Sequence, residues 1–149
     1  MGTVEIRDAV EADLSAVRDV FRRASWANEG DRPLLERHPE FLVFTDLPVL
    51  EGRTRVALID GRLVGFASTI DEGAWLELED LFVDPDWMRH GVGRALVSDI
   101  VERARVAGIP EIAVDGNTHA LEFYEQVGFV AGATVALEHG TAVRMTLIV

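Results

Sequence analysis

LFVDPDWMRHGVGRAL, residues 81–96, joins an apolar run to the start of an amphipathic helix. Leu81–Val83 has the apolar character of a buried strand, and an acidic turn follows it. From Val92 to Ala107 apolar residues recur every three or four positions, which predicts a helix, and Gly108 and Pro110 mark its end. The stretch therefore predicts a strand, a turn and a long helix in direct succession.

Gly91 and Gly93 lie where this helix begins. Glycines at such a place let backbone N–H groups approach a ligand, and those groups together with the helix dipole attract an anion. Arg89 and Arg94 add positive charge at the same point. We interpret the turn as a candidate diphosphate site, with a tight strand-to-helix connection that binds nothing as the alternative.

Other familiar chemistries lack their residues in this chain. A dinucleotide fingerprint needs a small residue where Leu96 stands, and neither a P-loop Gly-Lys-Ser/Thr nor a Gly-x-Ser-x-Gly element is present. The sequence has no cysteine, which excludes disulfides and a cysteine nucleophile. Its four histidines are scattered without metal-binding spacing, so we predict no metal site.

Strands and helices can be predicted on both sides of the glycine turn from periodicity and turn residues. The Asp60-Gly61 pair between apolar runs predicts a hairpin. The expected strands are Val4–Arg7, Arg55–Ile59, Arg62–Ile70, Trp75–Val83, Glu111–Val114, Val130–Leu137 and Ala142–Val149. The expected helices are Glu11–Arg23, one from Asp31 to a stop at Pro39, Val92–Ala107, and one capped by Asn117 that runs to about Val127. This order predicts a mixed α/β fold (α+β) with a mostly antiparallel central sheet flanked by helices.

Composition sets the outer limits of function. The chain has 149 residues and no linker-like stretch, so we expect one domain over residues 1–149. A net charge of −12 argues against nucleic-acid binding, which needs a basic face. Apolar runs are too short to span a membrane, and the N-terminus does not resemble a signal peptide. We expect a cytoplasmic protein.

Two motifs resemble the GNAT superfamily of acetyl-CoA-dependent N-acetyltransferases. Leu81–Pro85 followed by Gly91–Leu96 is similar to the family's acetyl-CoA motif. The residues from Asn117 through Tyr124 to Phe129 are similar to its last helix and exit, and Gly65–Ala67 is also family-like. Met88 departs from the family, which commonly has Gln or Arg there. The order of elements agrees over nearly the whole chain.

The resemblance implies a cofactor, a cleft and a reaction. In the family, the strand before the glycine turn splays from the next parallel strand, and acetyl-CoA lies in the cleft between them. The acetyl group then passes directly to a primary amine. The cofactor-binding residues that this implies are Leu81, Phe82, Val83, Arg89, His90, Gly91, Val92, Gly93, Arg94, Ala95, Asn117 and Tyr124.

Catalytic candidates follow from the same comparison. An ammonium acceptor must lose a proton before it attacks, and Glu77 is the first candidate for that base, with Glu79 next on the same strand face. Neighbouring carboxylates, including Asp80, are expected to raise the pKa of Glu77. Tyr124 falls where the family places the acid that serves the departing sulfur. The polar face of a half-exposed strand is the alternative interpretation of the carboxylates.

The acceptor and other partners are less defined by the sequence. Trp26 with Glu29 and Asp31 is a candidate grip for an ammonium group beside an aromatic face. A second copy of the chain is a candidate partner, and neither nucleic acid nor a membrane is expected. Two other classes of function stay open: an acyl-CoA-binding sensor without turnover, and an interaction protein that keeps only the fold.

Overall fold

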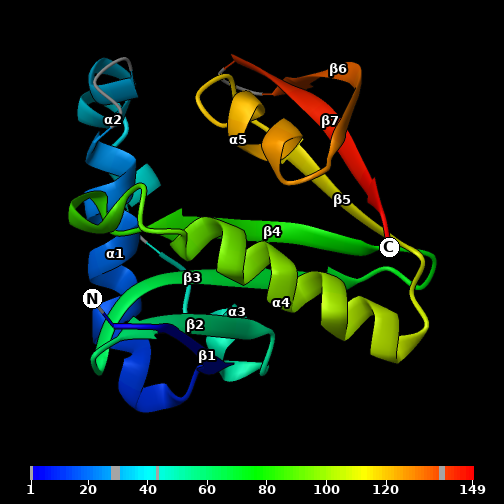
Figure 1. The fold of residues 1–149 in the computed structure, drawn as a ribbon. Coiled ribbons are helices and arrows are strands. Elements are labelled where there is room, and N and C mark those ends of the chain that lie inside the picture. Colours follow the sequence, from blue (N-terminus) through cyan, green and yellow to red (C-terminus); the bar gives the residue numbers. More distant parts are fainter. Residues whose placement is uncertain (1, 28–30, 43, 138–139) are drawn as a thin grey trace. The chain divides into compact units, whose positions relative to one another are not determined.

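The computed structural model describes residues 2–27, 31–42, 44–137 and 140–149. Figure 1 shows its helices and strands. The strands are β1 (Val4–Asp8), β2 (Thr54–Ile59), β3 (Arg62–Asp71), β4 (Leu76–Val83), β5 (Glu111–Gly116), β6 (Val130–Leu137) and β7 (Gly140–Ile148). The α-helices are α1 (Leu14–Ala27), α2 (Arg32–Arg37), α3 (Leu47–Leu50), α4 (Val92–Ala107) and α5 (Leu121–Gln126), with 3₁₀ turns η1 (Glu11–Asp13), η3 (Pro39–Leu42) and η4 (Pro85–Trp87).

The strands form one seven-stranded sheet in the order β1-β2-β3-β4-β5-β7-β6. The pairs β1–β2, β2–β3, β5–β7 and β6–β7 are antiparallel, whereas β4 and β5 are parallel. β4 and β5 pair only at Leu76↔Ile112 and Glu77↔Ala113, although both strands run on beyond these residues. The predicted mixed sheet is therefore confirmed. The cleft between a splayed strand pair stays a prediction.

The chain divides into two compact units. The first comprises Met1–Ser68 with Asp80–Leu96, and the second comprises Thr69–Glu79 with Val97–Val149. β3, β4 and α4 each pass from one unit into the other. That residues 1–149 act as a single acetyltransferase domain stays a prediction.

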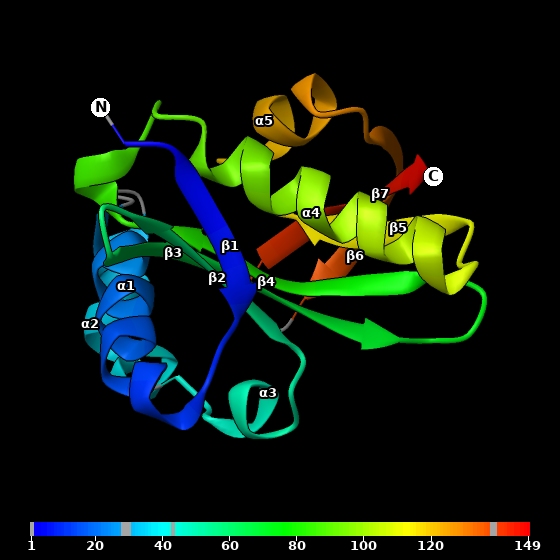
Figure 2. The same ribbon diagram turned by 60° about the horizontal axis from the view of Figure 1, so that its bottom comes forward.

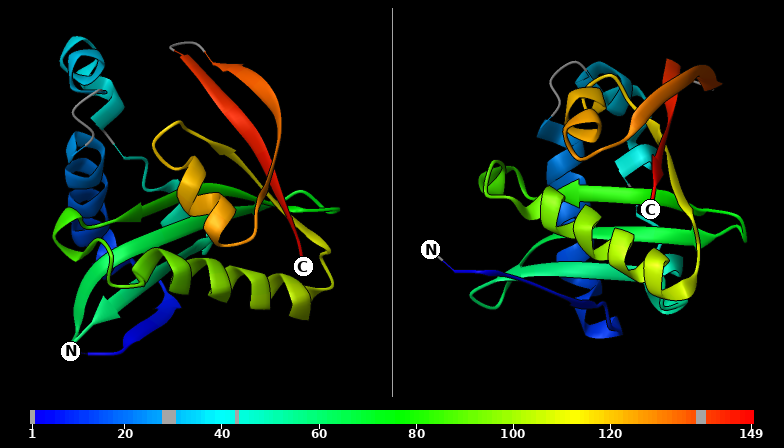
Figure 3. Two further views of the ribbon diagram at one scale, coloured as in Figure 1. Left: turned by 45° about the horizontal axis from the view of Figure 1, so that its top comes forward. Right: turned by 45° about the vertical axis from the view of Figure 1, so that its right-hand side comes forward.

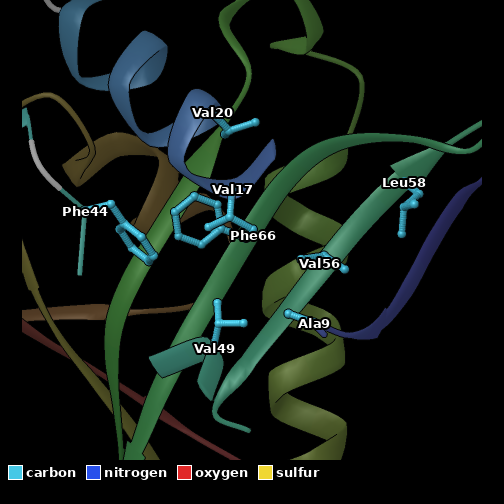
Figure 4. Close-up of a cluster of buried hydrophobic side chains, with 8 residues drawn as sticks. All are labelled: Ala9, Val17, Val20, Phe44, Val49, Val56, Leu58 and Phe66. Atoms are coloured by element: carbon cyan, nitrogen blue, oxygen red, sulfur yellow. The ribbon is translucent and has the colours of Figure 1, made fainter. Parts of the chain in front are cut away.

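A hairpin and a helix organise the first unit. Asp60 and Gly61 adopt φ angles of 50° and 80°, the left-handed pair that a tight two-residue hairpin between β2 and β3 requires. β1, β2 and β3 lie side by side (Figure 2). Val17 and Val20 of α1 are buried in a cluster with side chains of these strands (Figure 4).

Four phenylalanines extend this core. Phe66 of β3 contacts Phe44 and Phe82, with ring centroids 5.3 and 5.5 Å away. Phe21 of α1 lies 5.3 Å from Phe44 and 5.0 Å from Phe82. Because Phe82 belongs to β4, the aromatic cluster holds the end of β4 against α1 and β3.

The second unit is built on strands from the C-terminal part of the chain. β5, β7 and β6 pair in this order as an antiparallel set, and α5 lies between β5 and β6 in the sequence (Figure 3). Ile112 and Met145 bury their side chains almost completely, at 1% and 0% exposure. Tyr124 and Phe129 pack against each other, with ring centroids 5.3 Å apart.

Three local features differ from what the sequence indicated. The last helix begins at Leu121 rather than at a cap on Asn117, because the Asn117 side chain closes a turn ahead of it, accepting hydrogen bonds from the N–H groups of His119 and Ala120. The short helix α3 was not expected, since four residues show no periodicity. Ala107, the last residue of the apolar periodicity of α4, is exposed at the helix end.

Gly65 provides a test of packing beside the glycine turn. A Cβ added to Gly65 would lie 2.9 Å from Val92 Cγ1 and 3.0 Å from the Phe82 carbonyl oxygen. Gly65→Ala should therefore lower the free energy of unfolding by about 1–3 kcal/mol through overpacking. Urea denaturation measures this loss. Ser98→Ala on the exposed side of α4 is the control, and equal stability of the two variants would contradict the close packing.

Candidate active site

The glycine turn leads into α4 through a left-handed backbone. Arg89 and Gly91 both have left-handed φ angles, of 65° and 78°. The N–H of Ala95 donates to the carbonyl of Gly91 at 3.0 Å, which makes Gly91 the residue before the first helical turn. The N–H groups of residues 92–94 consequently have no acceptor within α4. The space beside Gly91 is open, since a Cβ built there would meet nothing within 4 Å.

Asp84 anchors the segment that leads into this turn. Its side chain is 2% exposed, and its Oδ1 accepts a hydrogen bond from the N–H of Asp86 at 2.9 Å. Arg23 of α1 donates to Asp84 Oδ2 at 2.5 Å and to Asp86 Oδ2 at 2.9 Å. The N–H of Asp84 donates to the carbonyl of Val64 at 2.8 Å. α1 and β3 thus fix the chain seven residues before Gly91.

The remaining side chains of the turn differ in how free they are to meet a ligand. His90 Nδ1 lies 2.8 Å from the carbonyl oxygen of Met88, so this ring nitrogen is engaged within the turn. Arg89 and Arg94 are exposed and make no ion pair with a described residue. Leu81, Phe82 and Val83 are half-buried at the end of β4, and Val92 is buried.

A second cluster surrounds Glu77 on β4. Arg144 of β7 donates to both carboxylate oxygens of Glu77, each at 2.6 Å, and Trp75 Nε1 donates to Glu77 Oε1 at 3.1 Å. Arg144 also contacts Asp115 of β5 at 3.1 Å. The sequence interpretation missed Arg144, although an arginine within the apolar run of β7 was a signal that a nearby acid pairs with it.

This contact reverses an expectation about Glu77. Burial alone would raise its pKa, but hydrogen bonds from Arg144 and Trp75 and the charge of Arg144 outweigh burial and hold the pKa below its usual value. The prediction that neighbouring carboxylates raise this pKa was therefore wrong. Glu79 is exposed on the same strand and has interactions of its own.

Asn117 and Tyr124 lie in the second unit with Glu77. The Asn117 side-chain oxygen is used in its turn, at 3.1 and 3.0 Å from the nitrogens of His119 and Ala120. Tyr124 is 7% exposed, and its ring lies in edge-on contact with Phe123 and Phe129. A Cβ on Gly116 would come within 3.3 Å of the Tyr124 ring, so the small residue at 116 makes room for it.

Two of the three predicted acceptor residues, Trp26 and Asp31, lie among the described residues. Trp26 is 36% exposed at the end of α1, and Asp31 is half-buried just before α2. Glu29 lies outside the described residues. Arg32 instead covers the Trp26 ring, with its guanidinium carbon 5.5 Å from the ring centroid. The sequence interpretation did not foresee this contact.

The sequence of this chain is similar to those of known proteins. The model of the acetyltransferase (GNAT) family matches residues 16–129. The glucosamine 6-phosphate N-acetyltransferase of Trypanosoma brucei brucei is 35% identical over 78 residues, covering 48% of this chain and 53% of that protein. The alanine N-acetyltransferase of ribosomal protein bS18 from Escherichia coli K12 is 32% identical over 76 residues, covering 47% and 49%. The chain therefore belongs to the acetyltransferase (GNAT) family.

A solved structure shares the fold over the full length. The PaiA N-acetyltransferase from Thermoplasma acidophilum, in complex with coenzyme A, superimposes with a TM-score of 0.79 at 20% identity, covering 99% of both chains. By contrast, the matches to the curated relatives span only about half the length of those proteins. Within the described residues no helix is long and apolar enough to cross a membrane, and no group of three potential metal ligands is found.

The Arg144 contact predicts a pH dependence of stability. A carboxyl whose pKa is lowered by folding stabilises the protein above its unfolded pKa, and that contribution disappears as the pH falls through the folded pKa. Arg144→Gln should therefore reduce the free energy of unfolding at pH 7 and raise the pKa of Glu77.

Urea denaturation from pH 7 down to pH 3 and NMR titration of the Glu77 carboxyl measure both effects. The difference in the free energy of unfolding between the parent protein and Arg144→Gln should become smaller as the pH falls. A difference that stays constant with pH would mean that Arg144 contributes packing alone.

Proposed function

We propose that the chain binds acetyl-CoA and transfers its acetyl group to a primary amine. The observation that carries this proposal is the open turn at Gly91, with left-handed φ angles before a long helix, in a chain of the acetyltransferase family. Amides at such a helix start suit a diphosphate, and Arg89 and Arg94 supply compensating charge. The donors present thus match the group that they would hold.

The cofactor roles follow from position along β4 and α4. The N–H groups of residues 92–94 and the side chains of Arg89 and Arg94 bind the diphosphate. Backbone groups of residues 81–83 pair with the pantetheine arm in the manner of an added strand. Asn117 contacts that arm through its side-chain amide, whose oxygen also closes its turn. His90 contributes its backbone, because its ring is engaged with Met88.

The reaction needs a base and an acid. As the amine attacks the thioester carbonyl, a C–N bond forms, the C–S bond breaks, and the nitrogen loses a proton while the sulfur gains one. Glu77 and Glu79 are the candidate bases. Arg144 engages both oxygens of Glu77 and lowers its pKa, which favours Glu79 as the base and Glu77 as a fixed charge. Tyr124 protonates the departing sulfur.

The relatives leave the acceptor open. One is named for a phosphorylated amino sugar and another for the alanine of a ribosomal protein, so the family accommodates unlike amines. We include in the proposal a cytoplasmic setting, where acetyl-CoA is available, and action without nucleic acid. A homodimer stays a prediction.

Gly91→Asp tests the cofactor site. The added carboxylate would repel a diphosphate and would strain a φ of 78°, so acetyl-CoA binding should be abolished while the protein stays folded. Isothermal titration with acetyl-CoA measures the affinity.

Gly52→Asp is the matched control, because Gly52 has a φ of 74° and equally open surroundings in another turn. If Gly91→Asp binds as tightly as Gly52→Asp, the cofactor lies elsewhere on the protein.

Tyr124→Phe tests the acid. The change keeps the packed ring and removes one hydroxyl, so acetyl-CoA affinity should be retained while turnover falls by about 10²- to 10⁴-fold. Release of free thiol in the presence of an amine measures turnover. Full activity in Tyr124→Phe would remove this residue from the mechanism, and binding without thiol release in the parent protein would favour a sensor.

A further inference from the structure

A pocket of about 590 Å³ lies within the first unit, between the end of α1, the start of α2 and the turn after β4. We call it the Arg-Trp pocket. Its volume is in the range of sites for small molecules. The residues that line it are Arg22, Arg23, Trp26, Ala27, Arg32 and Pro85.

The arginines of the Arg-Trp pocket are not equivalent. Arg23 donates to Asp84 and Asp86, so its charge is balanced by carboxylates. Arg22 and Arg32 make no ion pair with any carboxylate in the described part of the chain. Among the described residues, neither of these two positive charges is balanced by a carboxylate, although the net charge of the protein is −12.

Contacts with Trp26 hold Arg32 in place. The Nε of Arg32 donates to the carbonyl oxygen of Trp26 at 2.9 Å, and its guanidinium carbon lies 5.5 Å from the centre of the Trp26 ring. These contacts use one nitrogen and one face of the guanidinium. The two terminal nitrogens make no hydrogen bond to a described residue. A guanidinium held in this way is a preorganised fork for a carboxylate or a phosphate.

We propose that the Arg-Trp pocket binds an anionic group, a carboxylate or a phosphate, that the acceptor amine carries. This inference rests on the proposed function and gives its acceptor a chemical class. It replaces the predicted ammonium grip at Trp26, because the protein's own Arg32 already provides the cation over that ring. A negatively charged protein repels anions at long range, so the local arginines are what allows such an acceptor to bind.

Paired acceptors provide the test. O-phosphoethanolamine and ethanolamine form one pair, and β-alanine and β-alaninamide form another. In each pair the first amine carries an anionic group and the second does not. In the parent protein kcat/KM should favour the anionic member by about tenfold or more. Arg32→Gln and Arg22→Gln should each reduce that preference, whereas Arg103→Gln, on the exposed side of α4, should retain it. An unchanged preference in Arg32→Gln, or preference for the uncharged member, would overturn the proposal.

Acetyl-CoA also carries phosphate groups, so a second experiment distinguishes an anion of the acceptor from an anion of the cofactor. Titrations with acetyl-CoA and with its 3′-dephospho form should give the same affinities in Arg32→Gln as in the parent. If Arg32→Gln lowers the affinity for acetyl-CoA but not the affinity for the 3′-dephospho form, the pocket binds the cofactor's 3′-phosphate and the proposal is wrong.

A third experiment tests anion binding in the Arg-Trp pocket without requiring turnover. Inorganic phosphate should bind the parent protein more tightly than the Arg22→Gln/Arg32→Gln double variant. Equal phosphate affinity would overturn the proposed pocket. Weaker binding by the double variant, in a protein that acetylates no amine, would sustain the pocket and reject the proposed function.

Discussion

The buried carboxylate of Asp84 is the constraint on which the candidate cofactor site depends. A carboxylate that is 2% exposed must be paired and hydrogen-bonded, because an isolated buried charge is costly. Arg23 supplies the charge at 2.5 Å, and the N–H of Asp86 supplies a hydrogen bond at 2.9 Å. Together with the hydrogen bond from Asp84 N–H to Val64, these contacts fix where β4 ends. The left-handed turn at Arg89 and Gly91 then starts from a fixed point.

Among the described residues, the arginines of the protein fall into two groups, those that contact a carboxylate and those that do not. Arg7, Arg18, Arg23 and Arg144 contact carboxylates and join segments that are distant in sequence or in neighbouring elements. At the glycine turn and in the Arg-Trp pocket, the described residues provide no carboxylate partner for Arg89, Arg94, Arg22 and Arg32. Exposed Arg37 and Arg103 have no carboxylate partner in the described part of the chain either, so an unpaired arginine alone does not mark a site. What distinguishes the two proposed sites is the setting, a helix start in one and a pocket with an aromatic wall in the other.

Local chemistry made much of the fold predictable. The helix Val92–Ala107 and the hairpin at Asp60-Gly61 were predicted because periodicity and turn residues act over a few positions. The ion pairs were not, since Arg144 and Glu77 are 67 residues apart and Arg23 and Asp84 are 61 apart. The same distance explains the wrong direction for the Glu77 pKa, because partial burial and the acids adjacent in sequence would raise this pKa, whereas Arg144, which lowers it, is distant in sequence. The positive lining of the Arg-Trp pocket likewise depends on how α1 and α2 meet.

NMR of the backbone amides tests the account most directly. Addition of coenzyme A to the ¹⁵N-labelled protein should shift the amide proton resonances of Val92, Gly93 and Arg94 downfield, because these N–H groups would donate to the diphosphate. Saturable binding of coenzyme A that leaves these three resonances unchanged, while amides elsewhere move, would contradict the proposed cofactor site.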